Sequence, residues 1–144
     1  MISDNKIKLF LVDDDAVFLK SLEIEFLQHA DFSIETFATG EECIIALSHK
    51  PDVVILDYML DGVVKNVMNG IETLDKIKAY DPEIPVIILS AQDKIEVAIN
   101  CMHHKAFDYV VKSETAFIRL KKIITSIFQY RKLEKELSWY MERM

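Results

Sequence analysis

Short apolar runs recur along this chain, and segments with helical spacing separate them. Val53–Leu56 and Val86–Leu89 contain apolar residues only, and Ile7–Val12 is interrupted by a single lysine, Lys8. Strands that lack an alternation of polar and apolar residues are typical of sheets buried on both faces. Because both faces must then be covered, the pattern predicts a parallel sheet between two layers of helices.

Further segments complete a regular alternation of strand and helix. We expect the second strand at Phe32–Ala38, the third at Asp52–Leu56 and the fifth at Phe107–Val111. Apolar residues at helical spacing, from Val17 to Leu27, follow the first strand. Five strands that alternate with five helices predict a doubly wound, five-stranded parallel α/β fold, a three-layer sandwich.

Capping residues predict where the helices begin. Thr39-Gly40-Glu41-Glu42 and Asn69-Gly70-Ile71-Glu72 each place a glutamate three residues after an N-cap residue, the pattern of a capping box. The second of these helices should end before Asp81-Pro82, because proline disfavours a preceding helical residue. We expect Asp93 and Ser113 to cap the last two helices.

Composition indicates a globular protein without a membrane segment. Hydrophobic residues make up 51% of the 144 residues and charged residues 28%, and no apolar run approaches the ~18–20 residues that a membrane span requires. The N-terminus lacks the pattern of a secretion signal. Cys43 and Cys101 are isolated, so we expect them to be reduced, half-buried apolar residues. These features predict a cytoplasmic protein that makes no membrane contact.

Charge is distributed unevenly along the chain. The net charge is −7, yet the residues from 113 to 144 include seven Lys or Arg and four Glu. An acidic body repels a phosphate backbone, so we expect no direct contact with nucleic acid. We interpret the basic residues near the C-terminus as the solvated face of a helix.

Polar side chains stand where four of the expected strands end. Asp13 and Asp14 follow the first strand, Asp57 the third, Ser90 the fourth and Lys112 the fifth. Ligands of open parallel sheets bind at this edge. In the flavodoxin-like strand order 2-1-3-4-5 the first and third strands are neighbours, which places the acidic residues roughly 5 Å apart.

Three carboxylates at this spacing repel one another unless one is protonated or a cation intervenes. A hard divalent cation such as Mg²⁺ (or Mn²⁺) accepts oxygen ligands and leaves positions for water and a phosphoryl oxygen. A carboxylate nucleophile, a metal, the Ser90 hydroxyl and the Lys112 ammonium together stabilise a transferring phosphoryl group. The pattern predicts a metal-assisted phosphoryl-acceptor site with Asp57 as the acceptor.

At these residues the chain resembles the receiver domain of two-component response regulators, of which chemotaxis receivers are examples. The matching strings are Leu11-Val12-Asp13-Asp14-Asp15, Val54-Ile55-Leu56-Asp57, Ile88-Leu89-Ser90-Ala91 and Asp108-Tyr109-Val110-Val111-Lys112. The resemblance implies a receiver domain at residues 6–125 and a C-terminal helical extension at residues 126–144. It implies a switch that takes its phosphoryl group from a sensor histidine kinase or a phosphotransfer protein and then regulates a downstream protein target. We expect no DNA-binding output domain within these residues.

The resemblance also implies a role for each acidic residue. Asp57 would accept the phosphoryl group, and the chain would catalyse this transfer and its own dephosphorylation without being a conventional enzyme. Asp14 and Asp57 would bind Mg²⁺ directly, together with the backbone carbonyl of Met59. Asp13 would act through metal-bound water.

The remaining site residues would hold the phosphoryl group and respond to it. Ser90 and Lys112 would each contact a phosphoryl oxygen. Tyr109 matches the switch aromatic of the family, which turns inward when the hydroxyl residue moves toward the phosphate. Met59 and Gln92 lie two positions past the acceptor and the hydroxyl residue, and we expect them to tune the lifetime of the phosphorylated state.

The loop after Asp57 departs from the family pattern. Asp61-Gly62 replaces the usual Pro-Gly pair, and the next glycine, Gly70, lies five residues further on than expected. The extra segment within 63–68 is unusually apolar for a loop. It either packs against the third or fourth helix as a longer turn, or serves as a partner-contact or gating loop beside the phosphorylation site.

Two further departures affect the backbone. Ser113 follows Lys112 where the family has proline, so we expect a trans peptide bond. Lys105 occupies the position of a family glycine, so it should adopt a left-handed conformation with modest strain.

Apolar residues continue at three- and four-residue steps to the end of the chain. They are Leu120, Ile123, Ile127, Tyr130, Leu133, Leu137, Tyr140 and Met144. The first three should bury against the sheet, and beyond about residue 130 the helix should outrun the core. The exposed part has three interpretations. It self-associates into a homodimer, it folds back onto the body, or it is a severed linker to an output domain.

Other interpretations stay open at this point. An aspartate at a strand end is commonly a turn or N-cap residue, which is how we interpret Asp15. We expect all four histidines, His29, His49, His103 and His104, on the surface. A phosphatase of the haloacid dehalogenase type also uses an Asp nucleophile and Mg²⁺, but the residues after Asp13-Asp14-Asp15 do not match it. A flavodoxin shares the fold, but no hydroxyl- and Gly-rich loop follows the first strand.

Overall fold

The computed structural model, which describes residues 6–62 and 66–144, confirms the predicted sandwich. Its five strands are all parallel and lie in the order β2-β1-β3-β4-β5. The strands are β1 (Ile7–Val12), β2 (Phe32–Phe37), β3 (Val53–Asp57), β4 (Val86–Ser90) and β5 (Asp108–Val111). The helices are α1 (Ala16–Leu27), α2 (Gly40–Ile45), α3 (Gly70–Tyr80), α4 (Ile95–His103) and α5 (Ala116–Glu142), with a 3₁₀ turn, η1 (Ala46–His49), after α2.

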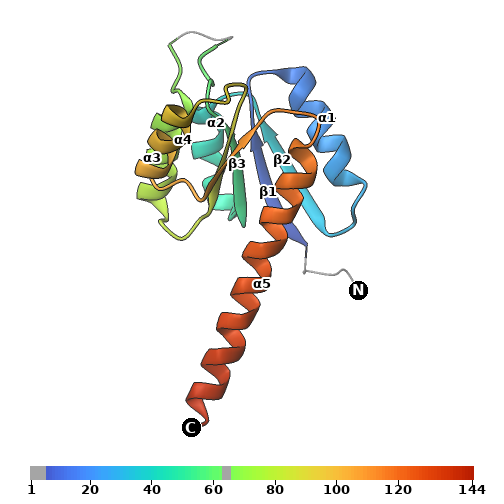
Figure 1. Cartoon of the computed structure of the whole chain (residues 1–144), viewed down its shortest axis with the longest axis vertical. Helices are drawn as coiled ribbons and strands as arrows, with labels where there is room; N and C mark the ends of the chain where they lie inside the picture. Colours follow the sequence, from blue (N-terminus) through green and yellow to red (C-terminus); the bar gives the residue numbers. More distant parts are fainter. Residues whose placement is uncertain (1–5, 63–65) are drawn as a thin grey trace.

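The helices divide between the two faces of the sheet (Figure 1). Alternate side chains of each strand point to opposite faces, so Phe10 and Val54 pack against α2, α3 and α4. Leu9 and Ile55 pack against α1 and α5. The buried strands of the centre therefore serve two separate cores, as their uninterrupted apolar sequence predicted.

The strand register brings the polar strand ends together. Val12 pairs with Leu56, so the residues that follow β1 lie beside the end of β3. Asp57 pairs with Leu89, next to Ser90. The backbone N–H of Lys112 donates to the carbonyl of Ser90 at 2.8 Å. All four predicted site segments consequently meet at the carboxyl edge of the sheet.

The N-terminal caps of the first three helices form largely as predicted. Asp15 accepts the N–H groups of the first turn of α1. Asn69 and Glu72 complete a reciprocal capping box at α3, which ends at Tyr80. At α2 the Thr39 hydroxyl accepts the N–H of Glu42 and also contacts the Glu42 carboxylate, so that box is not reciprocal.

The caps expected for the last two helices are wrong. Lys94 and Thr115 occupy the N-cap positions of α4 and α5, and neither side chain makes a capping hydrogen bond. Asp93 lies one residue too early to cap. Ser113 closes the preceding turn, because its hydroxyl accepts the N–H of Thr115 at 3.3 Å.

Strand ends and cysteines show smaller differences. β3 begins at Val53 rather than Asp52, because the Asp52 carboxylate accepts the N–H of Lys8 at 2.8 Å and closes the end of the sheet. Cys43 and Cys101 are fully buried, not half-buried, since both point into the core beneath α2 and α4. Burial raises the pKa of the Cys43 thiol to about 12 and that of Cys101 to about 11, so both are protonated at neutral pH.

The end of α4 confirms the left-handed conformation expected at Lys105, whose φ is 70°. The N–H of Lys105 donates to Met102, and the N–H of Ala106 donates to Cys101, as in a Schellman motif. The Lys112–Ser113 bond is trans, as are all peptide bonds of the described ranges.

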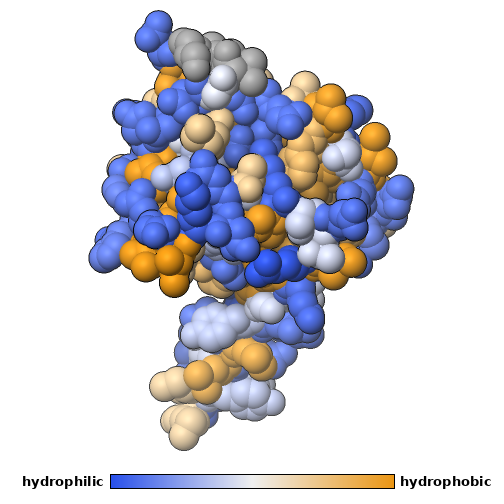
Figure 2. Space-filling view, turned by 45° about the horizontal axis from the view of Figure 1, so that its top comes forward, coloured by the Kyte–Doolittle hydropathy of each residue, from blue (hydrophilic) through white to orange (hydrophobic). Residues whose placement is uncertain are grey.

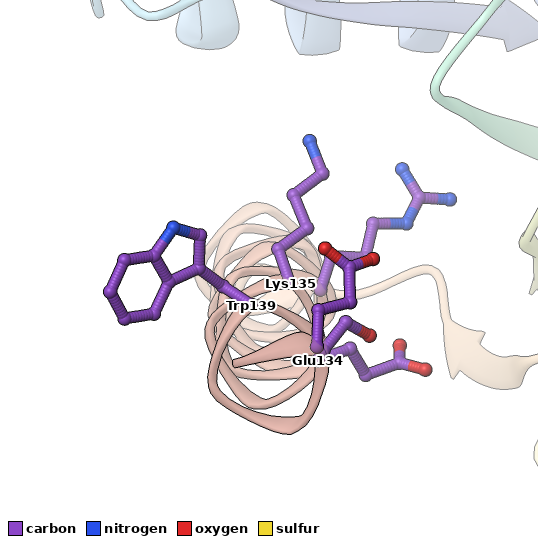
Figure 3. A pocket seen from close by; sticks show the side chains of 6 residues that line it. Glu134, Lys135 and Trp139 are labelled. Carbon is purple, nitrogen blue, oxygen red and sulfur yellow. The ribbon is translucent and has the colours of Figure 1, made fainter. Parts of the chain in front are cut away.

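The last helix, α5, continues without a break for 27 residues and projects well beyond the body (Figure 1). Leu120, Ile124 and Ile127 are buried against the sheet, whereas Ile123 is only partly buried. Every residue from 132 onward is exposed, and Figure 3 shows Glu134, Lys135 and Trp139 standing out from different sides of the helix. The interpretation that this segment folds back onto the body is therefore wrong. In the described ranges, no helix combines the length and the apolar character that crossing a membrane requires.

Gly70 gives a test of how tightly α3 is seated against the end of β3. A Cβ atom at this position would lie 2.5 Å from the carbonyl oxygen of Asp57 and 2.7 Å from that of Tyr58. We expect Gly70→Ala to lower the free energy of unfolding by about 1–3 kcal/mol, because backbone must move. Urea denaturation measures the change. In the control, Gly62→Ala, the added Cβ meets its nearest atoms at 3.4 Å and should have a smaller effect; equal stability of the Gly70 variant and wild type would contradict the prediction.

Candidate functional site

Three carboxylates meet at the carboxyl edge of the sheet. Asp13 and Asp57 are each 3% exposed, and Asp14 is partly exposed. One carboxylate oxygen from each residue lies within 4.8 Å of the other two. This confirms the spacing of about 5 Å inferred from neighbouring strands.

Lys112 lies between two of these carboxylates. Its Nζ atom is 2.8 Å from Asp13 Oδ2 and 3.3 Å from Asp57 Oδ1, and its side chain is 15% exposed. The other oxygen of Asp13 accepts the N–H of Asp15 at 2.9 Å. Burial by itself lowers the pKa of Lys112, but the hydrogen bond to Asp13 and the two negative charges outweigh it and raise the pKa.

Two buried carboxylates at this edge share one ammonium group, since Lys112 contacts both Asp13 and Asp57. Burial and the neighbouring Asp13 raise the pKa of Asp57 to about 7, although Lys112 opposes this shift. A hard cation with oxygen ligands fits this donor set, because three carboxylate oxygens lie within 4.8 Å of one another.

A backbone carbonyl lies next to the acidic group. The carbonyl oxygen of Met59 and the Oδ2 atom of Asp14 both lie 3.4 Å from the point where a Cβ on Gly62 would stand. Both oxygens therefore lie close to Gly62. That Met59 contributes its carbonyl to a metal site stays a prediction.

On the other side of Asp57, two hydrogen bonds connect Ser90 with Tyr109. The Ser90 side chain is buried, and its Oγ accepts the N–H of Gln92 at 3.0 Å. The carbonyl of Gln92 accepts the hydroxyl of Tyr109, whose ring packs against the core under α4. The expected switch residues, Ser90 and Tyr109, are therefore connected by hydrogen bonds through the backbone of Gln92, in the loop that follows β4.

The loop after Asp57 is described only in part. Residues 63–65 of the apolar insertion lie outside the described residues. The N–H of Met68 donates to the carboxylate of Glu41 at 2.8 Å, so the end of the insertion is held by α2, a helix that neither interpretation had named.

The four histidines do not belong to the acidic group. His49 contacts Glu35 at 2.9 Å, His104 contacts Asp75 at 2.7 Å, and His29 stacks on Phe117. His103 is exposed. Their predicted surface positions are confirmed for His49 and His103, and His29 and His104 are partly exposed.

Phe18 also lies at the site, although no motif in the sequence pointed to it. The Lys112 Nζ lies over the Phe18 ring, 4.7 Å from its centroid. In the sequence Phe18 has the helical spacing of a core residue, and only its position three residues after the Asp15 cap marks it as close to the strand end.

Comparison with known proteins identifies the class to which this fold and site belong. The family model of the response regulator receiver domain matches residues 9–125. The chain therefore belongs to the receiver domain family of two-component response regulators, as its resemblance implied.

Curated relatives are longer proteins. The protein-glutamate methylesterase/protein-glutamine glutaminase of Clostridium acetobutylicum is 36% identical over 118 residues, which are 78% of this chain and 32% of that protein. The DNA-binding transcriptional regulator NtrC of Klebsiella pneumoniae is 36% identical over 104 residues, which are 72% of this chain and 21% of NtrC. The chain thus spans about a fifth to a third of the length of these relatives.

Solved structures confirm the fold. NtrX from Brucella abortus superposes with a TM-score of 0.77 at 27% identity, over 95% of this chain and 30% of NtrX. The CheX–CheY–BeF3–Mg²⁺ complex from Borrelia burgdorferi contains a chain that superposes with a TM-score of 0.72 at 28% identity, over 85% of this chain and 89% of that chain.

The repulsion between the buried Asp13 and Asp57 carboxylates predicts an effect of Asp57 on stability. Asp57→Asn removes one of these two carboxylates, so we expect the free energy of unfolding without metal at neutral pH to rise by on the order of 2 kcal/mol. The same variant should lose most of the stabilisation that Mg²⁺ gives the wild type. Urea denaturation with chelator and with Mg²⁺ measures both effects.

Asp31→Asn is the matched control, because it removes an exposed carboxylate. It should keep the wild-type response to Mg²⁺. A metal-free Asp57→Asn protein that is less stable than wild type would contradict the expected repulsion.

Proposed function

We propose that the chain is a phosphorylation switch in which Asp57 accepts a phosphoryl group from a sensor histidine kinase or a phosphotransfer protein. The observation that carries the proposal is the position of Asp57, buried at the carboxyl edge between the Lys112 ammonium and two further carboxylates. In the transfer, an Asp57 oxygen forms a bond to phosphorus, and the bond from phosphorus to the donor imidazole breaks. The donor leaves as a neutral imidazole after protonation.

The chain's own residues stabilise the transferred group. Lys112 and the Ser90 hydroxyl flank Asp57 from β5 and β4, so each would hold a different phosphoryl oxygen. Asp13 keeps Lys112 at the site through the 2.8 Å ion pair. Mg²⁺ or Mn²⁺, when held by Asp14, Asp57 and the Met59 carbonyl, with Asp13 acting through water, would supply positive charge next to the phosphoryl oxygens. The presence of BeF3 and Mg²⁺ in the Borrelia complex supports this assignment.

The output of the switch would be a population shift at the surface of α4, β5 and α5, read by a downstream protein. Tyr109 would respond when Ser90 moves toward the phosphoryl group, because Gln92 connects the two residues. Met59, which is 49% exposed, and Gln92 flank the approach of water and would tune the lifetime of the phosphorylated state.

Residues 6–125 would form the receiver domain and residues 126–144 a helical extension. The exposed apolar residues of the extension repeat with a heptad pattern, with Tyr130, Leu137 and Met144 at one core position and Leu133 and Tyr140 at the other. We propose that this seam pairs with a second copy of the chain. The proposal places the switch in the cytoplasm, with no nucleic acid or membrane as a direct partner, and the two free, buried cysteines agree with a reducing compartment.

Phosphorylation by a small donor tests the proposed function. Incubation with acetyl phosphate and Mg²⁺ should add one phosphoryl group, located on Asp57 by peptide mass spectrometry. Asp57→Asn should stay unlabelled, and Ser90→Ala and Lys112→Ala should be phosphorylated roughly 10²-fold more slowly. Asp31→Asn serves as a control and should match wild type.

The same experiment separates the alternatives. A haloacid dehalogenase-type phosphatase would turn over many equivalents of donor, and a flavodoxin would copurify with flavin. Wild-type protein that carries no label at Asp57 would refute the receiver function.

The extension predicts a homodimer. Leu133→Glu combined with Leu137→Glu should raise the dimer dissociation constant at least about tenfold, because charges replace two seam residues. Sedimentation equilibrium with and without beryllofluoride measures it. As a control, Lys132→Glu combined with Ser138→Glu introduces two glutamates outside the seam. It should raise the dissociation constant less than the Leu133 and Leu137 double variant does. A wild-type chain that is monomeric at high concentration would rule the dimer out.

A further inference from the structure

We propose that Phe18 of α1 is a positioning residue for phosphoryl transfer. Its ring would hold the Lys112 ammonium in place while the ammonium exchanges an Asp57 oxygen for a phosphoryl oxygen. The inference rests on the proposed function of Asp57 and adds a residue outside the four polar strand ends.

Three groups surround the Lys112 ammonium. Asp13 and Asp57 contact it at 2.8 and 3.3 Å, and the face of the Phe18 ring lies 4.7 Å away, measured to its centroid. An ammonium group over an aromatic face within about 6 Å is attracted by the ring quadrupole, most strongly where water is excluded. The low exposure of the Lys112 side chain meets that condition.

The position of Phe18 follows from the local structure of the strand end. Asp13 accepts the N–H of Asp15, and the Asp15 carboxylate in turn accepts the N–H of Phe18 at 3.1 Å. One chain of hydrogen bonds therefore fixes the Asp13 carboxylate and the backbone of Phe18. The Phe18 side chain also packs against the core shared by α1 and α5, which restrains the ring.

A ring suits this task better than a third carboxylate. When phosphoryl arrives on Asp57, Lys112 must move from a carboxylate oxygen to a phosphoryl oxygen. A hydrogen bond has a preferred direction that resists such a shift, whereas the ring attracts the ammonium over its whole face. The ring adds no negative charge beside the two carboxylates that already contact Lys112.

The rate of phosphorylation by acetyl phosphate tests the proposal. Phe18→Leu keeps an apolar side chain but removes the ring, and should lower the rate constant about threefold to tenfold at saturating Mg²⁺. Phe18→Tyr keeps the ring and should restore most of the rate. The Mg²⁺ concentration for half-maximal rate should stay unchanged in both, because Phe18 acts on Lys112, which is not among the groups proposed to hold the metal.

Val17→Ala is the matched control on the same turn, since Val17 is 80% exposed. It should match wild type. A Leu variant as fast as wild type, or Leu and Tyr variants that lose equal rate, would overturn the proposal while leaving Asp57 as the acceptor. Urea denaturation of each variant shows whether it folds. Should the Leu variant not fold, Phe18→Met provides the comparison between a side chain with a ring and one without. Wild-type protein that carries no phosphoryl group on Asp57 would instead refute the proposed function.

Discussion

The structure depends on one electrostatic constraint, the repulsion among three carboxylates at a buried sheet edge. Asp13 and Asp57 are almost fully buried and share the ammonium of Lys112. Burying like charges close together is costly for stability, and such groups are retained where they serve a function. Here the closeness of the three carboxylates explains the fit to a divalent cation, and burial beside Asp13 explains the raised pKa of Asp57. The rest of the fold holds these groups together against their repulsion.

Much of this arrangement could be predicted from sequence, because it depends on period and register. The uninterrupted apolar residues of Val53–Leu56 implied burial on both faces, and the structure gives each face its own core. A polar residue directly after a buried parallel strand must lie at the carboxyl edge of the sheet. This is why Asp57, Ser90 and Lys112 could be placed at one edge from the sequence, and why the strand order predicted the spacing of the acidic residues.

The features that sequence reasoning missed depend on side-chain contacts between segments. Asp52 leaves the strand because its carboxylate meets the N–H of Lys8, a residue 44 positions away. Thr115 replaces Ser113 as the N-cap residue because the serine closes a turn. Phe18 reads as an ordinary core residue until the fold brings Lys112 across its ring. In each case the local sequence pattern is compatible with several contacts for the side chain, and tertiary packing determines which contact forms.

The contacts of the site reach both helical layers. Phe18 belongs to the layer of α1 and α5, and it touches Lys112 directly. Ser90 reaches the other layer through Gln92 and Tyr109, whose ring packs beneath α4. A new charge on Asp57 would therefore act on one layer through a cation and on the other through a hydroxyl. The two layers differ in what they present to solvent, because α5 continues past the body as an exposed helix on which apolar and charged side chains are mixed (Figure 2). A chemical change at one edge of the sheet can therefore affect both helical layers. A switch whose input and output sites lie apart requires such a connection between them.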